Sequence, residues 1–162
     1  MRKSIYYLII MAACILSGCS RKTVASAYQD YKIQCLGVEH DGSQTLLSWG
    51  EGRNRADAVE QAKKNAVREV IFNGIHDGNS SCDQRPLLNI PNAEERYREY
   101  FQRFFADGGE YKKYVSTVDE RSGSRNVEKY QYGRKMSVTV RVLRSELRER
   151  LQNDNVLHLS LI

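Results

Sequence analysis

Four cysteines and three histidines are the side chains of this 162-residue chain that most readily react or bind metals. They are Cys14, Cys19, Cys35, Cys82, His40, His76 and His158. A structural zinc site needs its ligands in closely spaced pairs. Cys35, Cys82 and the three histidines show no such spacing, so the sequence predicts no metal site.

Catalytic motifs are missing from the sequence. It contains no serine nucleophile elbow, zinc-protease helix motif, phosphate-binding loop or acidic calcium loop. The His-Asp dipeptides at residues 40–41 and 76–77 cannot face each other as a catalytic dyad must, and both fall in turns, where Asp is common. Glu94 and Glu95 could be the paired carboxylates of a glycosidase, but their place at a predicted helix start explains them equally well. We therefore predict no catalytic residue and no cofactor.

The first 18 residues have the form of a bacterial signal peptide. Arg2 and Lys3 supply positive charge, and residues 5–16 form an apolar run that is too short for a bilayer, which needs about 20 helical residues. Leu-Ser-Gly-Cys at residues 16–19 resembles the lipobox of bacterial lipoproteins. The resemblance implies cleavage before Cys19, whose thiol then carries diacylglycerol and whose amino group is acylated, for instance with palmitate. The alternative is an ordinary cleaved signal followed by an unrelated cysteine.

The next segment, residues 19–30, is short and polar, which predicts a lipidated tether in front of a domain at residues 31–152. Ser20 after Cys19 resembles the outer-membrane sorting choice of enteric-type lipoproteins. It implies a lipid anchor in the outer membrane, facing the periplasm, with the bilayer as one partner through acylated Cys19. Residues 153–162 are expected to form a C-terminal tail or an edge strand.

The remaining two cysteines are expected to form a disulfide. Cys14 would leave with the signal and Cys19 would carry the lipid, so Cys35 and Cys82 remain as a pair in an oxidising compartment. In the chain-entropy model this bridge stabilises the domain by about 4 kcal/mol. Two free thiols, the alternative, would both have to be buried.

The charge of the chain is mildly basic. It carries 25 Lys and Arg against 20 Asp and Glu, of which the signal removes two basic residues and no acidic one. The charges are interspersed, unlike the basic patch of a nucleic-acid-binding protein. We therefore predict no nucleic-acid partner.

Two hairpins are predicted from the alternation of apolar and polar residues. The first joins residues 31–38 to residues 44–49, and Gly50-Glu51-Gly52 reads as a loose exit from it. The second joins residues 110–118 to residues 127–142 around a polar turn. Its last strand alternates Met and Val with polar residues, so one face is expected to be buried and the other wet.

Three helices are predicted from apolar spacing and capping residues. They cover residues 55–73, between Asn54 and Gly74, residues 93–106, and residues 143–151. Residues 76–91 lie between the first two and predict a long loop. The fold class expected is a single α+β domain, with an antiparallel sheet of two hairpins, about four strands, packed with two or three helices in the order ββααββα.

Five aromatic residues in the second predicted helix suggest either core packing or a surface for a partner. They are Tyr97, Tyr100, Phe101, Phe104 and Phe105. An aromatic stripe at helical spacing is typical of a buried face. A partly exposed stripe would instead form a groove for another protein.

The strand pair that runs into Gly50-Glu51-Gly52 and then into an alanine-spaced helix resembles two families, over residues 31–75. These are the LPP-twenty-like lipoproteins and the N-terminal domain of the flagellar assembly protein FlgT. The resemblance implies a small envelope domain that acts by binding. We thus expect a membrane-anchored lipoprotein that serves, without catalysis, as a binding or assembly module for another envelope protein. The alternative is a cell-wall hydrolase with a site assembled from distant residues such as Glu51, His76 and Asp77.

Overall fold

The two longest strands of the sheet come from distant parts of the chain and lie side by side. The computed structural model describes residues 33–118, 127–130 and 133–157, which belong to one compact unit. Strand β2 (Gln44–Gly52) pairs with β6 (Gly133–Val142) in antiparallel orientation along its whole length. Gln44 lies opposite Val142 at one end and Gly52 opposite Arg134 at the other.

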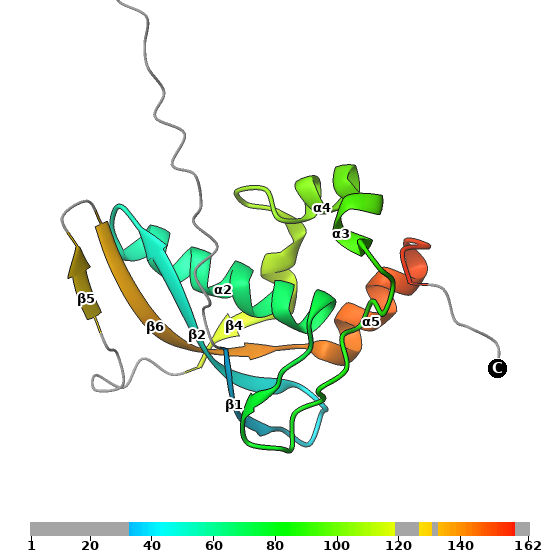
Figure 1. The fold of residues 1–162 in the computed structure, drawn as a ribbon, viewed down its shortest axis with the longest axis horizontal. Coiled ribbons are helices and arrows are strands. Elements are labelled where there is room, and N and C mark those ends of the chain that lie inside the picture. Colours follow the sequence, from blue (N-terminus) through cyan, green and yellow to red (C-terminus); the bar gives the residue numbers. More distant parts are fainter. Residues whose placement is uncertain (1–32, 119–126, 131–132, 158–162) are drawn as a thin grey trace, which may run out of the picture. The chain divides into compact units, whose positions relative to one another are not determined.

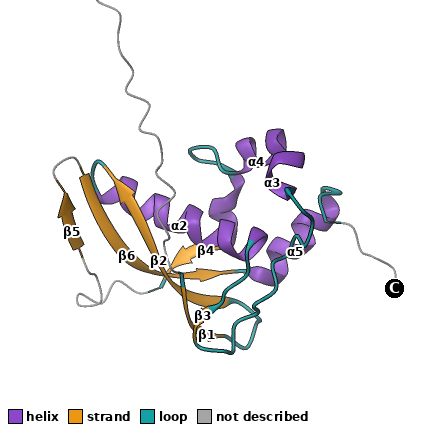
Figure 2. Ribbon diagram, viewed as in Figure 1, coloured by secondary structure: helices purple, strands orange, loops and turns teal. Residues whose placement is uncertain are grey.

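The sheet has six strands in the order β3-β1-β2-β6-β4, and β5 also pairs with β6 (Figure 2). Strand β1 (Gln34–Val38) forms the expected antiparallel hairpin with β2. Strand β3 (Asp77–Gly78) lies in the segment predicted as a loop and pairs with β1 in parallel orientation. The fold is the expected single α+β domain, but the sheet is mixed rather than antiparallel, because this loop returns along the outer edge of β1.

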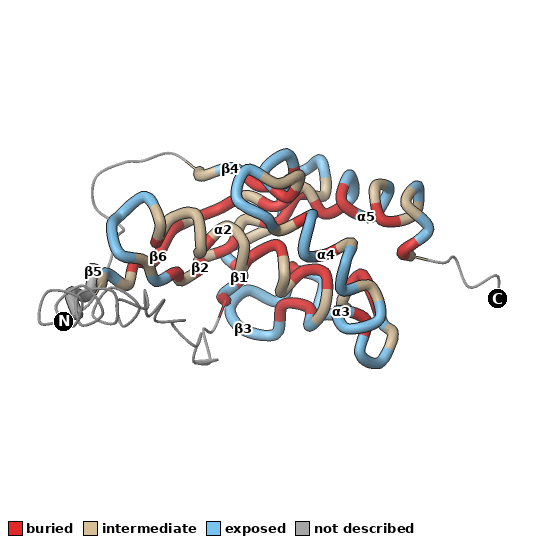
Figure 3. The backbone as a smooth tube through the Cα atoms, turned by 90° about the horizontal axis from the view of Figure 1, so that it is seen from above, coloured by how far each residue is buried: buried red, intermediate tan, exposed pale blue. Residues whose placement is uncertain are grey.

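The helices cover one face of the sheet (Figures 1 and 2). The residues of β2 and β6 that point to this face are buried, among them Leu46, Ser48, Val138 and Val140 (Figure 3). The residues between them in each strand point the other way, because side chains alternate along a strand. The alternation expected for residues 136–142 is thus present in β6, although Ser137 is also buried.

Helix α2 (Arg55–Phe72) packs directly on this face (Figure 1). The Asn54 side chain accepts a hydrogen bond from the N–H of Asp57 at 3.0 Å, so Asn54 is the N-cap predicted from the sequence. The buried side of the helix is mostly alanine and valine: Ala58, Ala62, Ala66, Val67, Val70 and Ile71. These small side chains bring the helix close enough for the Ser48 hydroxyl to donate a hydrogen bond to the Ala62 carbonyl, at 2.8 Å.

Two glycines of β2 permit this close approach. A Cβ atom on Gly50 would overlap the backbone of Ala58 and Ala62, and one on Gly52 would overlap the backbone of Ala58. Both glycines lie within the strand rather than after it. The Gly50-Glu51-Gly52 segment is therefore not the loose exit that we expected; it is the part of β2 against which the first turns of α2 pack.

The second predicted hairpin is more divided than expected. Residues 110–118 form a short 3₁₀ helix, η1 (Glu110–Tyr114), followed by strand β4 (Val115–Thr117). Strand β5 (Val127–Tyr130) and β6 replace the single strand expected over residues 127–142. Both β4 and β5 pair with β6, at opposite ends of the longer strand. The tyrosines of η1 explain the first difference, because Tyr111 and Tyr114 both turn into the core, which strand alternation would not allow.

The remaining helices form the outer part of the helical layer. The helix expected over residues 93–106 is two short helices, α3 (Ala93–Arg96) and α4 (Arg98–Phe104), separated at Tyr97, whose φ of −111° and ψ of 33° are not helical. Helix α5 (Arg144–Asn153) follows β6 as expected.

The segment between α2 and α3 is long but held at several points. Its backbone N–H groups at Leu87 and Leu88 donate hydrogen bonds to the carbonyls of Val70 and Ile71, at 3.1 and 2.9 Å. Both leucines are buried. At the other side, Arg144 of α5 donates hydrogen bonds of 2.8 Å to the Asp83 carboxylate and to the carbonyl of Arg85.

The Asp83 carboxylate makes the stability of this segment depend on pH. Burial raises its pKa, but the hydrogen bond from the Arg85 N–H and the charge of Arg144 outweigh burial and hold the pKa below its ordinary value. Because the folded state has the lower pKa, the stabilisation is present above about pH 4 and is lost as the pH falls through the folded-state pKa. We expect Asp83→Asn to lower the free energy of unfolding by about 2 kcal/mol at pH 7, since the buried Arg144 guanidinium loses its anionic partner, and by much less near pH 3.

Urea unfolding at the two pH values measures this difference. The control is Asp77→Asn, in the same segment, because no described residue forms an ion pair with Asp77. An Asp83→Asn effect of equal size at pH 7 and pH 3 would contradict the role given to the ion pair.

Several predicted features lie outside the described residues. These are the signal peptide, Cys19, the tether and the last five residues, 158–162. Of the predicted tail, residues 153–157 are described; Asn153 belongs to α5, and the other four do not form a strand. The N–H groups of Val156 and Leu157 instead donate hydrogen bonds to the carbonyl of Leu151, both at 2.9 Å, and Val156 is buried.

Candidate functional site

The predicted aromatic stripe is divided between the core and the surface. Phe101 and Phe104 are only 2% and 3% exposed, so they belong to the core and cannot form the exposed part of a partner surface. Tyr97, Tyr100 and Phe105 are partly buried at its margin. The stripe is therefore mostly the buried face of α4, and its more accessible members are Tyr97, Tyr100 and Phe105.

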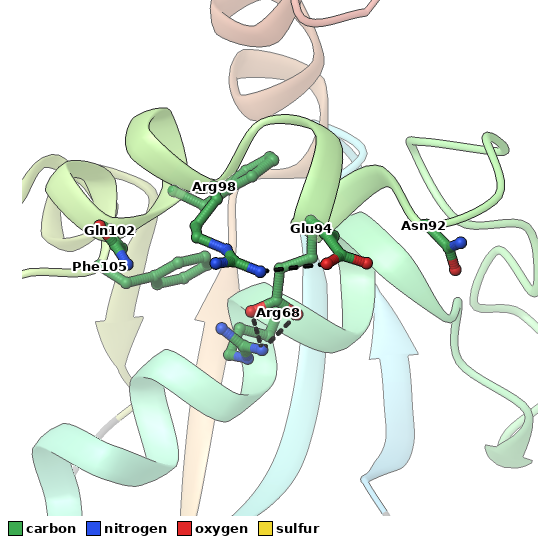
Figure 4. A pocket seen from close by; sticks show the side chains of 8 residues that line it. Arg68, Asn92, Glu94, Arg98, Gln102 and Phe105 are labelled. Atoms are coloured by element: carbon green, nitrogen blue, oxygen red, sulfur yellow. Dashed lines mark hydrogen bonds and ion pairs between the residues drawn. The ribbon is translucent and has the colours of Figure 1, made fainter.

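A groove lies where α3 and α4 meet α2, and we call it the α2–α4 groove (Figure 4). Its volume is about 690 Å³. It is lined by residues of α2, α3 and α4 and of the turn before α3: Arg68, Asn92, Glu94, Glu95, Arg98, Phe101, Gln102 and Phe105. Four of the eight are charged and two are aromatic, so the groove combines polar walls with an apolar floor.

The break at Tyr97 helps to build this groove. One continuous helix would carry its side chains around a single axis, whereas two short helices can each turn a polar side toward α2. The turn before α3 is fixed by Asn92, which has a left-handed backbone with φ 55°. Asn is one of the few residues that tolerate this conformation.

Arg68 lines the groove from the α2 side (Figure 4). Its Nη2 atom lies 2.5 Å from both carboxylate oxygens of Glu94. Its guanidinium carbon lies 5.7 Å from the ring centroid of Phe72 and 5.3 Å from that of Phe105. A guanidinium against aromatic rings is stabilised by the ring quadrupole, so Arg68 is held in place by more than its ion pair.

A second ion pair lines the same groove. Arg98 of α4 donates through Nη2 to an oxygen of Glu95 at 3.1 Å. Its side chain is 64% exposed. The charges of the two arginines and the two glutamates cancel. Each arginine contacts its glutamate through Nη2 alone, so its other N–H donors are not used in these ion pairs. The lining residues that could take part in polar contacts are two arginines, two glutamates and two amides.

The opposite side of α4 is fixed by a separate network. The Tyr100 hydroxyl donates to the Asp154 carboxylate at 2.7 Å, and Arg150 forms ion pairs of 2.8 Å with Asp154 and with Glu110. Burial, together with Asp154, raises the pKa of Tyr100 above its ordinary value. Tyr100 therefore has a structural role that joins α4, η1 and α5.

Tyr111 anchors η1 to α2 in a similar way. Its hydroxyl donates to the Glu60 carboxylate, and the ammonium of Lys64 lies 5.5 Å from its ring centroid. Together the two networks connect α4 and α2, two of the helices that line the groove, through η1 and α5.

The residues suggested for a hydrolase are not brought together. Asp77 of β3 pairs with Gln34 of β1, and Gln34 lies opposite Leu47 of β2. Glu51 lies four residues beyond Leu47 along β2, which corresponds to roughly 13 Å. Glu51 and Asp77 are therefore on opposite sides of β1 and far apart along the strands. His76 is exposed, and its Nε2 lies 3.0 Å from the carbonyl oxygen of Asn73. Within the described ranges, no cluster of three His, Cys, Asp or Glu residues could hold a metal ion.

Cys35 and Cys82 are joined by a disulfide in the structure, with their Cα atoms 6.0 Å apart. It ties the long segment after α2 to the edge strand β1. Both cysteines are buried, and neither lines the α2–α4 groove.

The central residues of the groove were missed by the sequence analysis. The sequence analysis did not single out Arg68, and it explained Glu94 and Glu95 by a predicted helix start. Arg68 and Glu94 are far apart in the sequence, so no local spacing could join them. The local sequence offered one weak signal: Arg68 and Glu94 are charged residues close to aromatic residues of predicted helices.

Comparison with known proteins places the chain in no family: no family model, no curated protein and no solved structure matches it. The resemblance to LPP-twenty-like lipoproteins and to the FlgT N-terminal domain therefore remains a prediction from the sequence.

Proposed function

We propose that this chain is an envelope lipoprotein, anchored through acylated Cys19, that acts without catalysis as a binding module for another protein of the envelope. The lipobox-like sequence at residues 16–19 supports the lipid anchor. Ser20, the residue after the lipobox, supports a location at the periplasmic face of the outer membrane. No helix in the described ranges is both long and apolar enough to cross a bilayer. We assign the membrane attachment to the lipid on Cys19.

The α2–α4 groove is the observation that supports the binding role. It is concave, it has a volume within the range of about 300–1,000 Å³ common for ligand pockets, and it offers unused guanidinium donors beside an aromatic surface. Arginine and aromatic side chains are the residues that most often dominate binding at protein interfaces. The hydrolase alternative is not favoured by this arrangement, because Glu51 lies apart from His76 and Asp77.

Labelled palmitate tests the anchor. We expect cells that produce the full chain to attach the label, and we expect Cys19→Ser to abolish it. Cys14→Ser is the matched control, because Cys14 lies in the segment that is removed, and it should leave the labelling unchanged. A soluble, unlabelled protein would contradict the lipoprotein assignment.

Photo-crosslinking in intact cells tests the binding role. Benzoylphenylalanine in place of Gln102, which is exposed and lines the groove, should capture an envelope protein. The same group in place of Glu149, exposed on α5 and outside the groove lining, should not. Equal capture from both positions, or capture of lipid alone, would contradict a docking role for the groove.

A further inference from the structure

We propose that the α2–α4 groove binds a short peptide that ends in a free carboxylate, with Arg68 and Arg98 as the residues that receive the carboxylate. The inference rests on the proposed binding role and names the ligand class of the same site.

Arg68 is prepared for an anionic group. The rings of Phe72 and Phe105 hold its guanidinium, so little side-chain freedom is lost when a ligand binds. Glu94 contacts only Nη2, and among the described residues neither Nε nor Nη1 has a hydrogen-bond partner. The side chain is 34% exposed, so these two donors are within reach of a ligand.

Glu94 shows which group fits and also limits how tightly it binds. Its carboxylate already lies on the guanidinium, in the place that a ligand carboxylate would share or take. The Glu94 side chain is 48% exposed, and an ion pair this exposed is weak. A ligand carboxylate can therefore displace Glu94 while the two aromatic rings keep Arg68 in position.

The rest of the lining favours a peptide over a small inorganic anion. Phe105 offers an apolar surface for a side chain, and Asn92 and Gln102 are exposed amides that can pair with peptide N–H and C=O groups. Glu94 and Glu95 would repel an ion with two negative charges, such as phosphate, more strongly than a single carboxylate. Glu95 can also receive a free amino terminus.

The test uses the full chain in detergent micelles, labelled with ¹⁵N, and the peptide alanyl-phenylalanyl-alanine. We expect saturable shifts of amide signals around Arg68 and Phe105, with a Kd of about 1 mM or tighter. The same peptide with a C-terminal amide should bind at least about tenfold more weakly, because it lacks the charge-assisted hydrogen bond. Inorganic phosphate, the second comparison, should also bind at least about tenfold more weakly.

Variants separate the roles of the groove residues. Arg68→Gln should weaken peptide binding about tenfold and Arg98→Gln about fivefold, whereas Glu94→Gln should strengthen it about threefold by removing the resident carboxylate. Arg103→Gln is the matched control, because Arg103 lies on α4 but does not line the groove. Arg98 is well exposed, so its variant carries the test even where Arg68→Gln affects folding.

Two groups of outcomes overturn the inference. Absence of binding, or equal binding of the acid and the amide, removes the carboxylate from recognition. Phosphate binding as tight as that of the peptide would show a general anion site. Weaker peptide binding by Glu94→Gln would show that Glu94 supports the groove instead of competing with the ligand. In either case the proposed binding function stands if the crosslinker in place of Gln102 still captures an envelope protein in cells. Failure of the peptide inference can therefore be distinguished from failure of the proposed function.

Discussion

Gly50→Ala is expected to lower the free energy of unfolding by about 3 to 4 kcal/mol, although it adds a single methyl group. The new Cβ would overlap the backbone of Ala58 and Ala62, and neither helix nor strand backbone can yield as a flexible side chain can. Relief would require α2 to move away from β2, which would also break the hydrogen bond from Ser48 to the Ala62 carbonyl. Thermal unfolding should show a loss of about 10 °C or more in Tm.

Gly37→Ala is the matched control for this variant. Gly37 also lies in a strand of the same sheet, but a Cβ there would have no atom within 4 Å, and its φ is not positive. It should be neutral or slightly stabilising, because alanine restricts the unfolded chain. An equal loss of stability in Gly37→Ala and Gly50→Ala would contradict the conclusion that Gly50 is needed for the close approach of α2 and β2.

Reduction of the Cys35–Cys82 disulfide is expected to lower the free energy of unfolding by about 4 kcal/mol. The two cysteines are 47 residues apart in the sequence, so the bridge restricts a long loop of the unfolded chain. In the folded state it fastens the segment after α2 to the outer edge of β1, which pairs there with the two-residue strand β3. Urea unfolding with and without a reductant measures the effect.

The double variant Cys35→Ser/Cys82→Ser provides the control for this measurement. It should unfold at the same urea concentration as the reduced parent, and a reductant should not change its midpoint. A parent midpoint that is insensitive to reductant would contradict a stabilising bridge.

The parts of the fold that depend on local sequence could be predicted. Helix α2 begins after Asn54 and ends before Gly74, whose φ of 79° is suited to glycine, because capping is decided by neighbouring residues. The hairpin of β1 and β2 was also visible in the alternation of its side chains. Strand β3 was not, because two residues carry no pattern and their pairing depends on where the rest of the chain returns.

Other features needed long-range information. The aromatic spacing of residues 97–105 is helical, yet it did not reveal the break at Tyr97, because burial of Phe101 and Phe104 is compatible with either one helix or two. The alternating Gly50 and Gly52 did carry a signal. Beside the alanine side of α2, they indicate close packing, a stronger explanation than the flexibility that we first assigned to them.

The pairing of Gln44 with Val142 has a consequence for how the protein is made. A ribosome delivers the chain from its first residue, so β2 emerges long before β6 and has only β1 beside it. An isolated two-stranded hairpin is marginally stable in water. We therefore expect the sheet to remain incomplete, with the β2 edge covered only by β1 and α2, until β6 has been synthesised.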